Sequence, residues 1–340
     1  MARDCSTVSI GIIALNEQEY LPNILADIAQ QDYADQKIEV ILVDSGSTDL
    51  TKQIMEDFAQ NHPQFQRVKI LDNPKKILPA GWNIFLDEAR NDVLVRVDAH
   101  ARIPTDFVSA SMAEINKGHD AVGGVRPCVV PDNATDWNRI LLAVEESIFG
   151  SSPAEYRGAK AKSGYVKSIF HGAYRKAIFD KVGRFNENLA RTEDNDINYR
   201  IRKAGYKIYL STSINSYQII RPTLPSMLKQ KYGNGYWIGR TLFIQPGCIN
   251  SYHLAPLGFV VLLASTGLLA ISRHRKTLPL KTLCFLYGSS DLVLSLDALR
   301  KSPRTPAALS LPVLFALMHI VYGVGTLRGI TDHVVKKLRS

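Results

Sequence analysis

Cysteine is scarce in this 340-residue sequence, and no two cysteines have Cys-x-x-Cys spacing. The four positions are Cys5, Cys128, Cys248 and Cys284. Such sparse cysteine excludes a disulfide scaffold, argues against a zinc site and is typical of a reducing compartment. Internal repeats and low-complexity tracts are also absent. With 46% hydrophobic and 21% charged residues, the chain is neither disordered nor collagen-like, and its length predicts one large domain or two smaller ones.

An apolar N-terminal stretch is missing as well: residues 1–6 have none behind Arg3, so we expect no cleaved signal peptide. Acidic residues are outnumbered by basic ones. The resulting net charge of +9 admits nucleic acid, anionic lipid headgroups or a phosphorylated substrate as partners. No basic helix or patch of interleaved aromatic residues is visible, so nucleic acid is not an expected partner.

Short apolar runs alternate with helical patterns in the N-terminal part of the chain. The runs lack strict polar–apolar alternation, which indicates strands buried on both faces of a parallel sheet. This alternation predicts right-handed βαβ crossovers and an α/β fold, with a doubly wound, mostly parallel sheet and helices on both faces. The expected strands are 8–15, 38–43, 67–71, 93–97 and 121–125, and the expected helices are 17–31, 48–60, 79–90 and 104–117.

Long apolar runs appear only in the C-terminal part. Residues 254–271 form 18 uncharged positions, which just reaches the length of a membrane span. Residues 306–327 form a second such run. The run 283–299 is the weakest candidate because it contains Asp291 and Asp297, and a carboxylate near the bilayer centre costs roughly 2.5–3.5 kcal/mol.

We therefore expect one domain over residues 1–240 and an apolar, helical, membrane-associated region over residues 241–340. The alternative is three buried helices of a soluble domain. Basic clusters flank the apolar runs and would contact anionic headgroups. The positive-inside rule favours the cytoplasmic side for all of them. A single crossing by residues 254–271 would put the first cluster outside if the N-terminal domain is inside, so the number of crossings stays open. The clusters are Arg273–Lys276 with Lys281, Arg300 and Lys301 with Arg304, and Lys336 and Lys337 with Arg339.

Polar side chains follow the expected strands at their carboxyl ends, where ligands bind in an open α/β sheet. Asn16 and Glu17 follow the first strand. The second strand ends in Asp44, followed by Ser-Gly-Ser-Thr-Asp at 45–49. For this segment, an ordinary turn and helix cap is the alternative to a ligand site.

Asp98 and His100 follow the fourth strand and are one residue apart, so they point the same way. A carboxylate oxygen and an imidazole nitrogen both suit a divalent ion such as Mn²⁺, whereas Mg²⁺ prefers oxygen ligands alone. Further along, Glu193 and Asp194 open a helical pattern. On their own, they are explained by the preference for acids at helix N-termini, worth under about 1 kcal/mol.

The series of motifs is more specific than any one of them. Asn-Glu, Asp-Ser-Gly-Ser-Thr-Asp and Asp-Ala-His each follow an apolar strand, and Thr-Glu-Asp-Asn-Asp at 192–196 then opens a helix. Over roughly residues 7–240, this series resembles the family 2 glycosyltransferases, which have the GT-A fold. It is most similar to the membrane-bound glucosyltransferases of succinoglycan-type exopolysaccharide synthesis, in agreement with the apolar tail.

This resemblance implies a site for a UDP-sugar. Asp44 matches the acid that hydrogen-bonds the uracil ring, whose imide N–H a carboxylate can accept. Asn16 and Glu17 then lie beside the nucleotide, and Ser45 and Ser47 lie at its edge.

The resemblance also implies a divalent metal, Mn²⁺ or Mg²⁺. Asp98 matches the first acid of the family's Asp-x-Asp motif and is expected to bind the nucleotide's phosphates through the ion, while His100 takes the place of the final acid. Asp194 matches the general base that removes the proton from the acceptor hydroxyl, a step worth on the order of 10²–10⁴-fold in rate, with inversion at the sugar carbon. Glu193 is expected to orient the acceptor.

His171 and Arg202 are expected on the acceptor side, although His171 is equally explained as a packed histidine. At the place of the Gln-x-x-Arg-Trp motif of processive members, this chain has Gly233 instead of Arg, which favours the transfer of a single sugar. Four further cations are expected to contact phosphate or headgroups: Arg221, Lys229, Lys231 and Arg240.

The expected function is metal-dependent, inverting transfer of a hexose, with UDP-glucose as the donor, in exopolysaccharide or cell-surface glycan synthesis. The acceptor would be a polyprenyl-diphosphate-linked saccharide or an oligosaccharide at the membrane lipid, with the catalytic domain on the cytoplasmic face of the cell membrane. One alternative is a non-catalytic GT-A scaffold in a polysaccharide assembly. Another is a sugar nucleotidyltransferase, which would need a glycine-rich basic loop that residues 14–20 do not supply.

Overall fold

The computed structural model describes residues 5–131, 133–151, 154–157, 161–272, 277–300 and 302–339. The chain divides into two compact units. The first unit consists of Met1–Pro127 and Ala154–Ile219, and the second of Cys128–Pro153 and Ile220–Ser340.

The first unit is built on an eight-stranded sheet with the order β3-β2-β1-β4-β9-β6-β10-β8. Strands β3, β2, β1 and β4 are parallel, as are β6 and β10, whereas β9 and β8 run antiparallel to their neighbours. All five strands expected from the sequence are present. The strands are β1 (Val8–Ala14), β2 (Ile38–Asp44), β3 (Arg67–Asp72), β4 (Val93–Arg96), β6 (Ala121–Val125), β8 (Gly164–Val166), β9 (Gly172–Arg175) and β10 (Ile208–Asn215). The short β11 (Tyr217–Ile219) pairs with β5 (Ala101–Arg102) outside this sheet.

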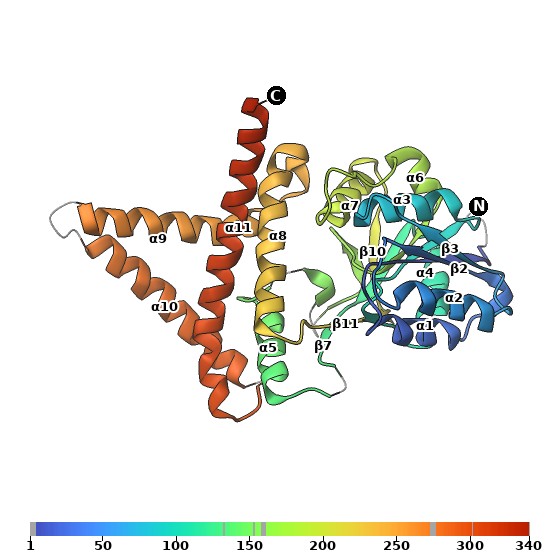
Figure 1. The fold of residues 1–340 in the computed structure, drawn as a ribbon, viewed down its shortest axis with the longest axis horizontal. Coiled ribbons are helices and arrows are strands. Elements are labelled where there is room, and N and C mark those ends of the chain that lie inside the picture. Colours follow the sequence, from blue (N-terminus) through green and yellow to red (C-terminus); the bar gives the residue numbers. More distant parts are fainter. Residues whose placement is uncertain are drawn as a thin grey trace. The chain divides into compact units, whose positions relative to one another are not determined.

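Helices cover both faces of the sheet, as expected (Figure 1). On one face, Val8, Ile10 and Ile12 of β1 pack with α1, α2 and α4. On the other, Ile13 and the next strand's Val43 pack with α3, α6 and α7. The helices are α1 (Leu21–Ala29), α2 (Thr51–Asn61), α3 (Leu78–Glu88), α4 (Phe107–Asn116), α6 (Ala177–Val182) and α7 (Glu193–Lys203). Burial of β1 and β2 along their whole length explains their continuous apolar sequences.

The antiparallel β9, between β4 and β6, is a feature that the sequence patterns did not indicate. It has only four residues and begins with a glycine, so it lacks a strong strand signal. Gly172 is required there because a Cβ atom would lie 2.7 Å from the carbonyl oxygen of Val122. The strand therefore depends on a close backbone approach, and periodicity does not reveal such contacts.

The second unit is helical. It contains β7 (Cys128–Val129), α5 (Asp136–Glu146), α8 (Leu224–Ile244), α9 (Ala255–Ser272), α10 (Leu278–Leu299) and α11 (Leu311–Arg339). Helix α8 runs alongside α11 (Figure 1). The expected division at residue 240 thus differs from the compact units, in which residues 128–153 and all of α8 lie with the apolar helices, because α8 packs on α11.

Glycines on both helices form the α8–α11 contact, here called the glycine seam: Gly235, Gly239, Gly325 and Gly329. A Cβ atom on Gly239 would lie 2.2 Å from the carbonyl oxygen of Thr326, and one on Gly329 would lie 2.0 Å from that of Tyr236. Both pairs have Gly-x-x-x-Gly spacing, which is typical of closely packed membrane helices.

Three helical segments are long and apolar enough to cross a membrane: Ser251–Ser272, Leu278–Leu299 and Pro306–Leu338. In α9, no residue is buried. Helix α10 buries Asp291 and Ser295, whereas its large apolar side chains, such as Phe285 and Val293, are exposed. This distribution is the reverse of a soluble helix and disagrees with the alternative of three helices buried in a soluble domain.

The basic clusters are only partly described, because Arg273–Lys276, Lys301 and the Arg339 side chain lie outside the described residues. Lys231 is not a headgroup contact. Its ammonium is buried, 2.9 Å from the Glu145 carboxylate and 3.0 Å from the carbonyl oxygen of Gly150. The expectation for this lysine was wrong, because its partner is on α5, far away in the sequence.

Candidate functional site

The expected site residues Asp44 and Asp98 lie at the carboxyl edge of the parallel strands. Asp44 is the last residue of β2 and is paired in register with Ala14 of β1. Asp98 follows β4, which ends at Arg96 and lies on the other side of β1. Because β1 is flanked by these two strands, Asp44 and Asp98 are presented at the same edge.

The loops after β1 and β2 hold each other through side chain–backbone hydrogen bonds. The Asn16 N–H donates to Ser47 Oγ at 3.0 Å, and the Asn16 amide oxygen accepts from the Thr48 N–H at 2.8 Å. Asn16 has a positive φ of 55°, which asparagine tolerates better than most residues. Asn16 thus shapes the loop, and α1 begins later, at Leu21.

Asp44 is buried, and its carboxylate accepts the N–H groups of Gly46 and Ser47 at 3.2 and 3.1 Å. These bonds fix the orientation of the carboxylate. Ser45 is also buried, and its hydroxyl accepts a hydrogen bond from the Asn73 amide at 3.0 Å. This bond connects the loop after β2 with the residues that follow β3.

Residues around Asp98 come from three other segments. The Nε2 atom of the buried His171, next to β9, lies 3.8 Å from Asp98 Oδ2, and its Nδ1 lies 2.9 Å from Ser216 Oγ. His100 Nδ1 lies 3.2 Å from Glu17 Oε1 and so connects the loop after β4 with the loop after β1.

The charge state of this group follows from its surroundings. Burial lowers the pKa of His171, and Arg126 and Arg96 lower it further against the effect of Asp98, so the ring is neutral near pH 7. Burial alone would raise the pKa of Asp98, but His171, Arg96 and His100 outweigh it and hold that pKa below its usual value. With His171 neutral, Arg96 is the cation that keeps Asp98 ionised.

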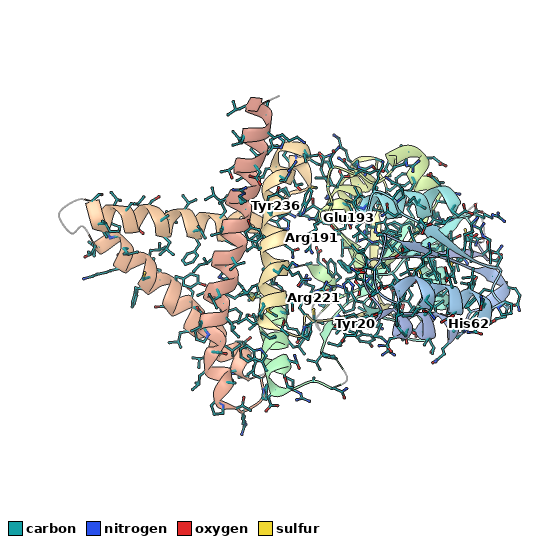
Figure 2. All side chains as sticks on the ribbon, viewed as in Figure 1. Tyr20, His62, Arg191, Glu193, Arg221 and Tyr236 are labelled. Atoms are coloured by element: carbon teal, nitrogen blue, oxygen red, sulfur yellow. The ribbon has the colours of Figure 1, made fainter. Side chains whose placement is uncertain are left out.

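Arg96 is a residue that the motif analysis missed. Its Nη2 atom donates to Glu193 Oε1 at 2.9 Å, and its guanidinium lies 4.8 Å from the ring centre of Trp82. Glu193, labelled in Figure 2, opens α7 and is 2% exposed. A charged residue within the apolar run Val93–Val97 was the available signal, because a strand buried on both faces rarely holds an unpaired cation.

Asp194 follows Glu193 in the first turn of α7 and accepts the N–H of Asn195 at 2.8 Å. Burial raises the pKa of Glu193 to about 7, with Asp194 adding to the shift and Arg96 opposing it. Burial also raises the pKa of Asp194; Arg96 opposes this shift and Asp98 adds to it. A carboxyl group with a raised pKa is suited to accept a proton near neutral pH.

A divalent ion needs several oxygen or nitrogen ligands. Within the described part of the chain, no group of three or more His, Cys, Asp or Glu side chains is arranged to hold an ion alone. His171 Nε2 is buried 3.8 Å from Asp98 Oδ2 and has no hydrogen-bond partner among the described residues. An imidazole nitrogen and a carboxylate oxygen suit Mn²⁺, and substrate phosphates complete such sites. Asp98 and His171 thus offer donor atoms of the kinds that an ion bound together with substrate phosphates would use.

Arg202 lies apart from these residues, near the C-terminal end of α7, eight positions beyond Asp194. At 1.5 Å per residue, this is about 12 Å along the helix axis. Two residues were expected on the acceptor side. The structure places His171 next to Asp98, whereas Arg202 lies away from both Asp98 and Asp194.

Comparisons with known proteins identify the family of the chain. Residues 9–183 match the family described as Glycosyl transferase family 2. A dolichyl N-acetyl-alpha-D-glucosaminyl phosphate 3-beta-D-2,3-diacetamido-2,3-dideoxy-beta-D-glucuronosyltransferase of Methanococcus voltae is 26% identical over 334 residues, covering 95% of this chain and 97% of the relative. The succinoglycan biosynthesis protein ExoA of Rhizobium meliloti is also 26% identical over 334 residues, covering 96% of each chain.

Solved structures show the same fold. A mannosyltransferase of Pyrobaculum calidifontis, in complex with GDP-Man and Mn²⁺, superposes with a TM-score of 0.61 at 16% identity and covers 94% of this chain and 86% of its own. TarS of S. aureus, residues 1–349 in complex with UDP-GlcNAc, has a TM-score of 0.50 at 16% identity, with 94% and 90% covered. By its family match and its fold, this chain belongs to glycosyl transferase family 2 and is a glycosyltransferase.

Proposed function

We propose that this glycosyltransferase moves a hexose, with UDP-glucose as the donor, onto a saccharide linked to a lipid diphosphate, with inversion at the sugar carbon. One observation carries the proposal. Arg96, at the end of β4, pairs with Glu193 at 2.9 Å and so joins the strand that presents Asp98 to the helix turn that presents Asp194. A leaving-group site and a base are thus held by one buried ion pair.

The donor would lie across the ends of β1, β2 and β4. The Asp44 carboxylate, oriented by its own loop, accepts the imide N–H of uracil. Asn16 and Glu17 lie next to it in the loop after β1, and Ser47 fixes that loop through the Asn16 N–H. The uracil contact distinguishes UDP from adenine nucleotides, because adenine has no ring N–H to donate to a carboxylate.

The diphosphate would lie at the end of β4. Asp98, His100 and His171 would hold a divalent ion there, either Mn²⁺ or Mg²⁺. When bound, the ion neutralises charge on the diphosphate leaving group. The neutral ring of His171 is in the correct state for ligation, because only an unprotonated nitrogen can bind a metal.

Asp194 would remove the proton from the acceptor hydroxyl. Its carboxyl has a raised pKa and is only partly buried, so an acceptor can reach it. The Glu193 carboxylate is paired with Arg96, and this ion pair holds the first turn of α7 in place. We therefore assign to Glu193 the positioning of Asp194 and of the acceptor.

The acceptor side of the proposal rests on the second unit and the relatives. A dolichyl phosphate derivative is named for the Methanococcus voltae relative, and undecaprenyl-phosphate for a transferase of Edwardsiella ictaluri that is 25% identical over 215 residues. The three apolar helices would cross or enter the cell membrane, where an anionic, lipid-linked acceptor is found. Cations such as Lys336 and Lys337 favour a cytoplasmic orientation, where they would meet anionic headgroups.

The test is a transfer assay with the full chain in detergent, using UDP-glucose, UDP-GlcNAc and GDP-mannose with Mn²⁺, Mg²⁺ or EDTA. We expect UDP release only with a divalent ion, and a loss of at least about 10²-fold for Asp194→Asn. Unchanged turnover of Asp194→Asn would remove this residue from the mechanism. Faster turnover of GDP-mannose would overturn the uracil assignment, and full activity in EDTA would overturn the metal site.

A further inference from the structure

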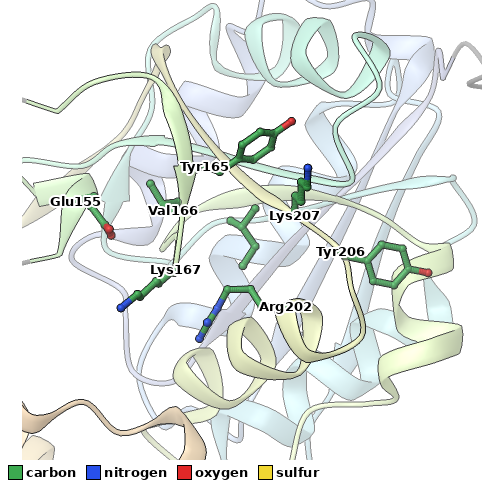
Figure 3. A pocket seen from close by; sticks show the side chains of 8 residues that line it. Glu155, Tyr165, Val166, Lys167, Arg202, Tyr206 and Lys207 are labelled. Atoms are coloured by element: carbon green, nitrogen blue, oxygen red, sulfur yellow. The ribbon is translucent and has the colours of Figure 1, made fainter.

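A pocket in the first unit is separate from the proposed catalytic residues. Its volume is about 310 Å³, near the lower limit of roughly 300–1,000 Å³ for small-molecule sites. Its walls come from α7, from β8 and β10, and from the 3-10 turn Glu155–Arg157 (Figure 3). It therefore lies at the edge strand of the sheet.

The topology places this pocket at the opposite end of the strands from the catalytic site. Ile208, one of its lining residues, is the first residue of β10 and pairs with Val166, the last residue of β8. Since β10 is parallel to β6, the pocket lies at the amino ends of the parallel strands, whereas Asp44 and Asp98 lie at carboxyl ends. The pocket is not part of the donor site.

Positive charge is in excess around the pocket. Lys167, Arg202 and Lys207 line it together with one acid, Glu155. Among the described residues, none of these three cations forms an ion pair. Figure 3 shows Lys167 and Arg202 reaching toward one end of the pocket, with Glu155 on the same side. This leaves an unneutralised charge of about two units, which favours an anionic ligand.

The helix that contributes Arg202 does not oppose an anion there. The last carbonyl groups of α7 already accept backbone N–H groups: Ala204 donates to Arg200, Gly205 to Arg202, and Tyr206 to Ile201. Their partial negative charge is therefore largely satisfied within the helix end.

An aromatic ring supplies the second contact. Tyr165 is 61% exposed, and its ring packs edge-on against Tyr209 with the centres 5.5 Å apart. The Lys207 ammonium lies 5.0 Å from the centre of the Tyr165 ring. The ring is thus held in place while remaining accessible, and it lies with Lys207 at the other end of the pocket (Figure 3). A flat, exposed ring of this kind stacks on the apolar face of a sugar.

We propose that this pocket binds an anionic saccharide, with its phosphate or carboxylate between Lys167 and Arg202 and its ring on Tyr165. The ligand is either a free sugar phosphate or an acidic sugar within a glycan, which share this chemistry. The inference concerns a site outside the donor pocket and does not depend on the proposed reaction.

The experiment is calorimetric titration of the full chain in detergent, with UDP and Mn²⁺ saturating so that the donor site is blocked. The probes are glucose 1-phosphate, a glucuronate-containing disaccharide, glucose and inorganic phosphate. We expect the two anionic sugars to bind, glucose to show no binding, and phosphate to bind at least tenfold more weakly. Binding should weaken as salt is added, because the cations are exposed. The stronger of the two anionic probes identifies the source.

Variants make the assignment specific. Lys167→Gln combined with Arg202→Gln should lower affinity at least tenfold, whereas Lys203→Gln, on the same helix but not lining the pocket, should change it less than twofold. Tyr165→Ala should weaken sugar phosphate and leave phosphate unchanged, and Tyr165→Phe should restore stacking. Binding that is absent, equal for glucose, or unchanged in the double variant would overturn the proposal. Because UDP release is measured separately, failure here leaves the proposed reaction unaffected.

Discussion

The Arg96 guanidinium donates to the Glu193 carboxylate at 2.9 Å, although the two residues are 97 positions apart in the chain. Both are buried, with 5% and 2% of their surfaces exposed. A charge at that depth is stable only with a partner, so the last residue of β4 and the first turn of α7 depend on each other. The ion pair thereby sets where Asp194 lies relative to Asp98.

Breaking this ion pair should lower the stability of the first unit against unfolding. Arg96→Met leaves the Glu193 carboxylate buried without a counterion, which typically costs about 3–5 kcal/mol. We expect a clearly lower midpoint in thermal unfolding of the detergent-solubilised protein. Arg96→Met combined with Glu193→Gln should regain part of the loss, since residue 193 then no longer has an unpaired buried charge. A double variant no more stable than Arg96→Met would contradict the pairing.

The pH dependence of transfer should have its acid limb well above the ordinary pKa of a carboxyl group. Burial raises the pKa of both Glu193 and Asp194, the former to about 7. The base acts only when unprotonated, so kcat/KM should rise with pH and level off above the pKa of the pair. Glu193→Gln should move the limb to lower pH, because Arg96 then stabilises the Asp194 charge alone. A limb near pH 4 in the unmodified protein would contradict the assignment.

Asp44→Ala should weaken UDP binding by roughly tenfold to a hundredfold, the usual worth of a hydrogen bond to a charged group. Because Asp44 also accepts the Gly46 and Ser47 N–H groups, the same change can loosen the loop. Titration with pyrophosphate and Mn²⁺ separates the two effects, since pyrophosphate has no uracil. Equal losses for UDP and pyrophosphate would count against a uracil contact.

The glycine seam predicts a position-specific effect on stability. Gly239→Ala places a methyl group 2.2 Å from the carbonyl oxygen of Thr326, so the helices must separate, at a cost of about 1–3 kcal/mol. The matched control is Gly267→Ala in α9, where a Cβ atom meets nothing within 4 Å and helix propensity favours alanine by up to about 1 kcal/mol. Thermal unfolding in detergent should show a loss only for Gly239→Ala; equal midpoints would refute the close contact.

Much of the first unit was predictable because local patterns determine it. Parallel strands buried on both faces have continuous apolar sequences, so β1, β2 and β4 were recognisable at once. Polar residues at the carboxyl ends of these strands predicted a ligand site there, because parallel strands end at the same edge of a sheet. The order of the motifs then identified the family, although no single motif would have done so.

The remaining features depend on contacts between distant segments. β9 is a four-residue strand held by a glycine contact, and no periodicity marks it. The partner of Lys231 is on α5, which explains why its role was misjudged. His171 is adjacent to Asp98 only because β9 pairs with β4. Arg202 was expected on the acceptor side with His171, but it lies near the C-terminal end of α7, far along the helix from Asp194.

Backbone meets backbone along α8 and α11, with no side chains between the two helices at Gly239 and Gly329. Rotamer changes therefore cannot absorb a displacement there. If one helix slid along the other, carbonyl oxygens would collide until the next glycine came into register, four residues away. Small sliding movements between α8 and α11 are thus suppressed. In any larger motion, the two helices must move together as one rigid body.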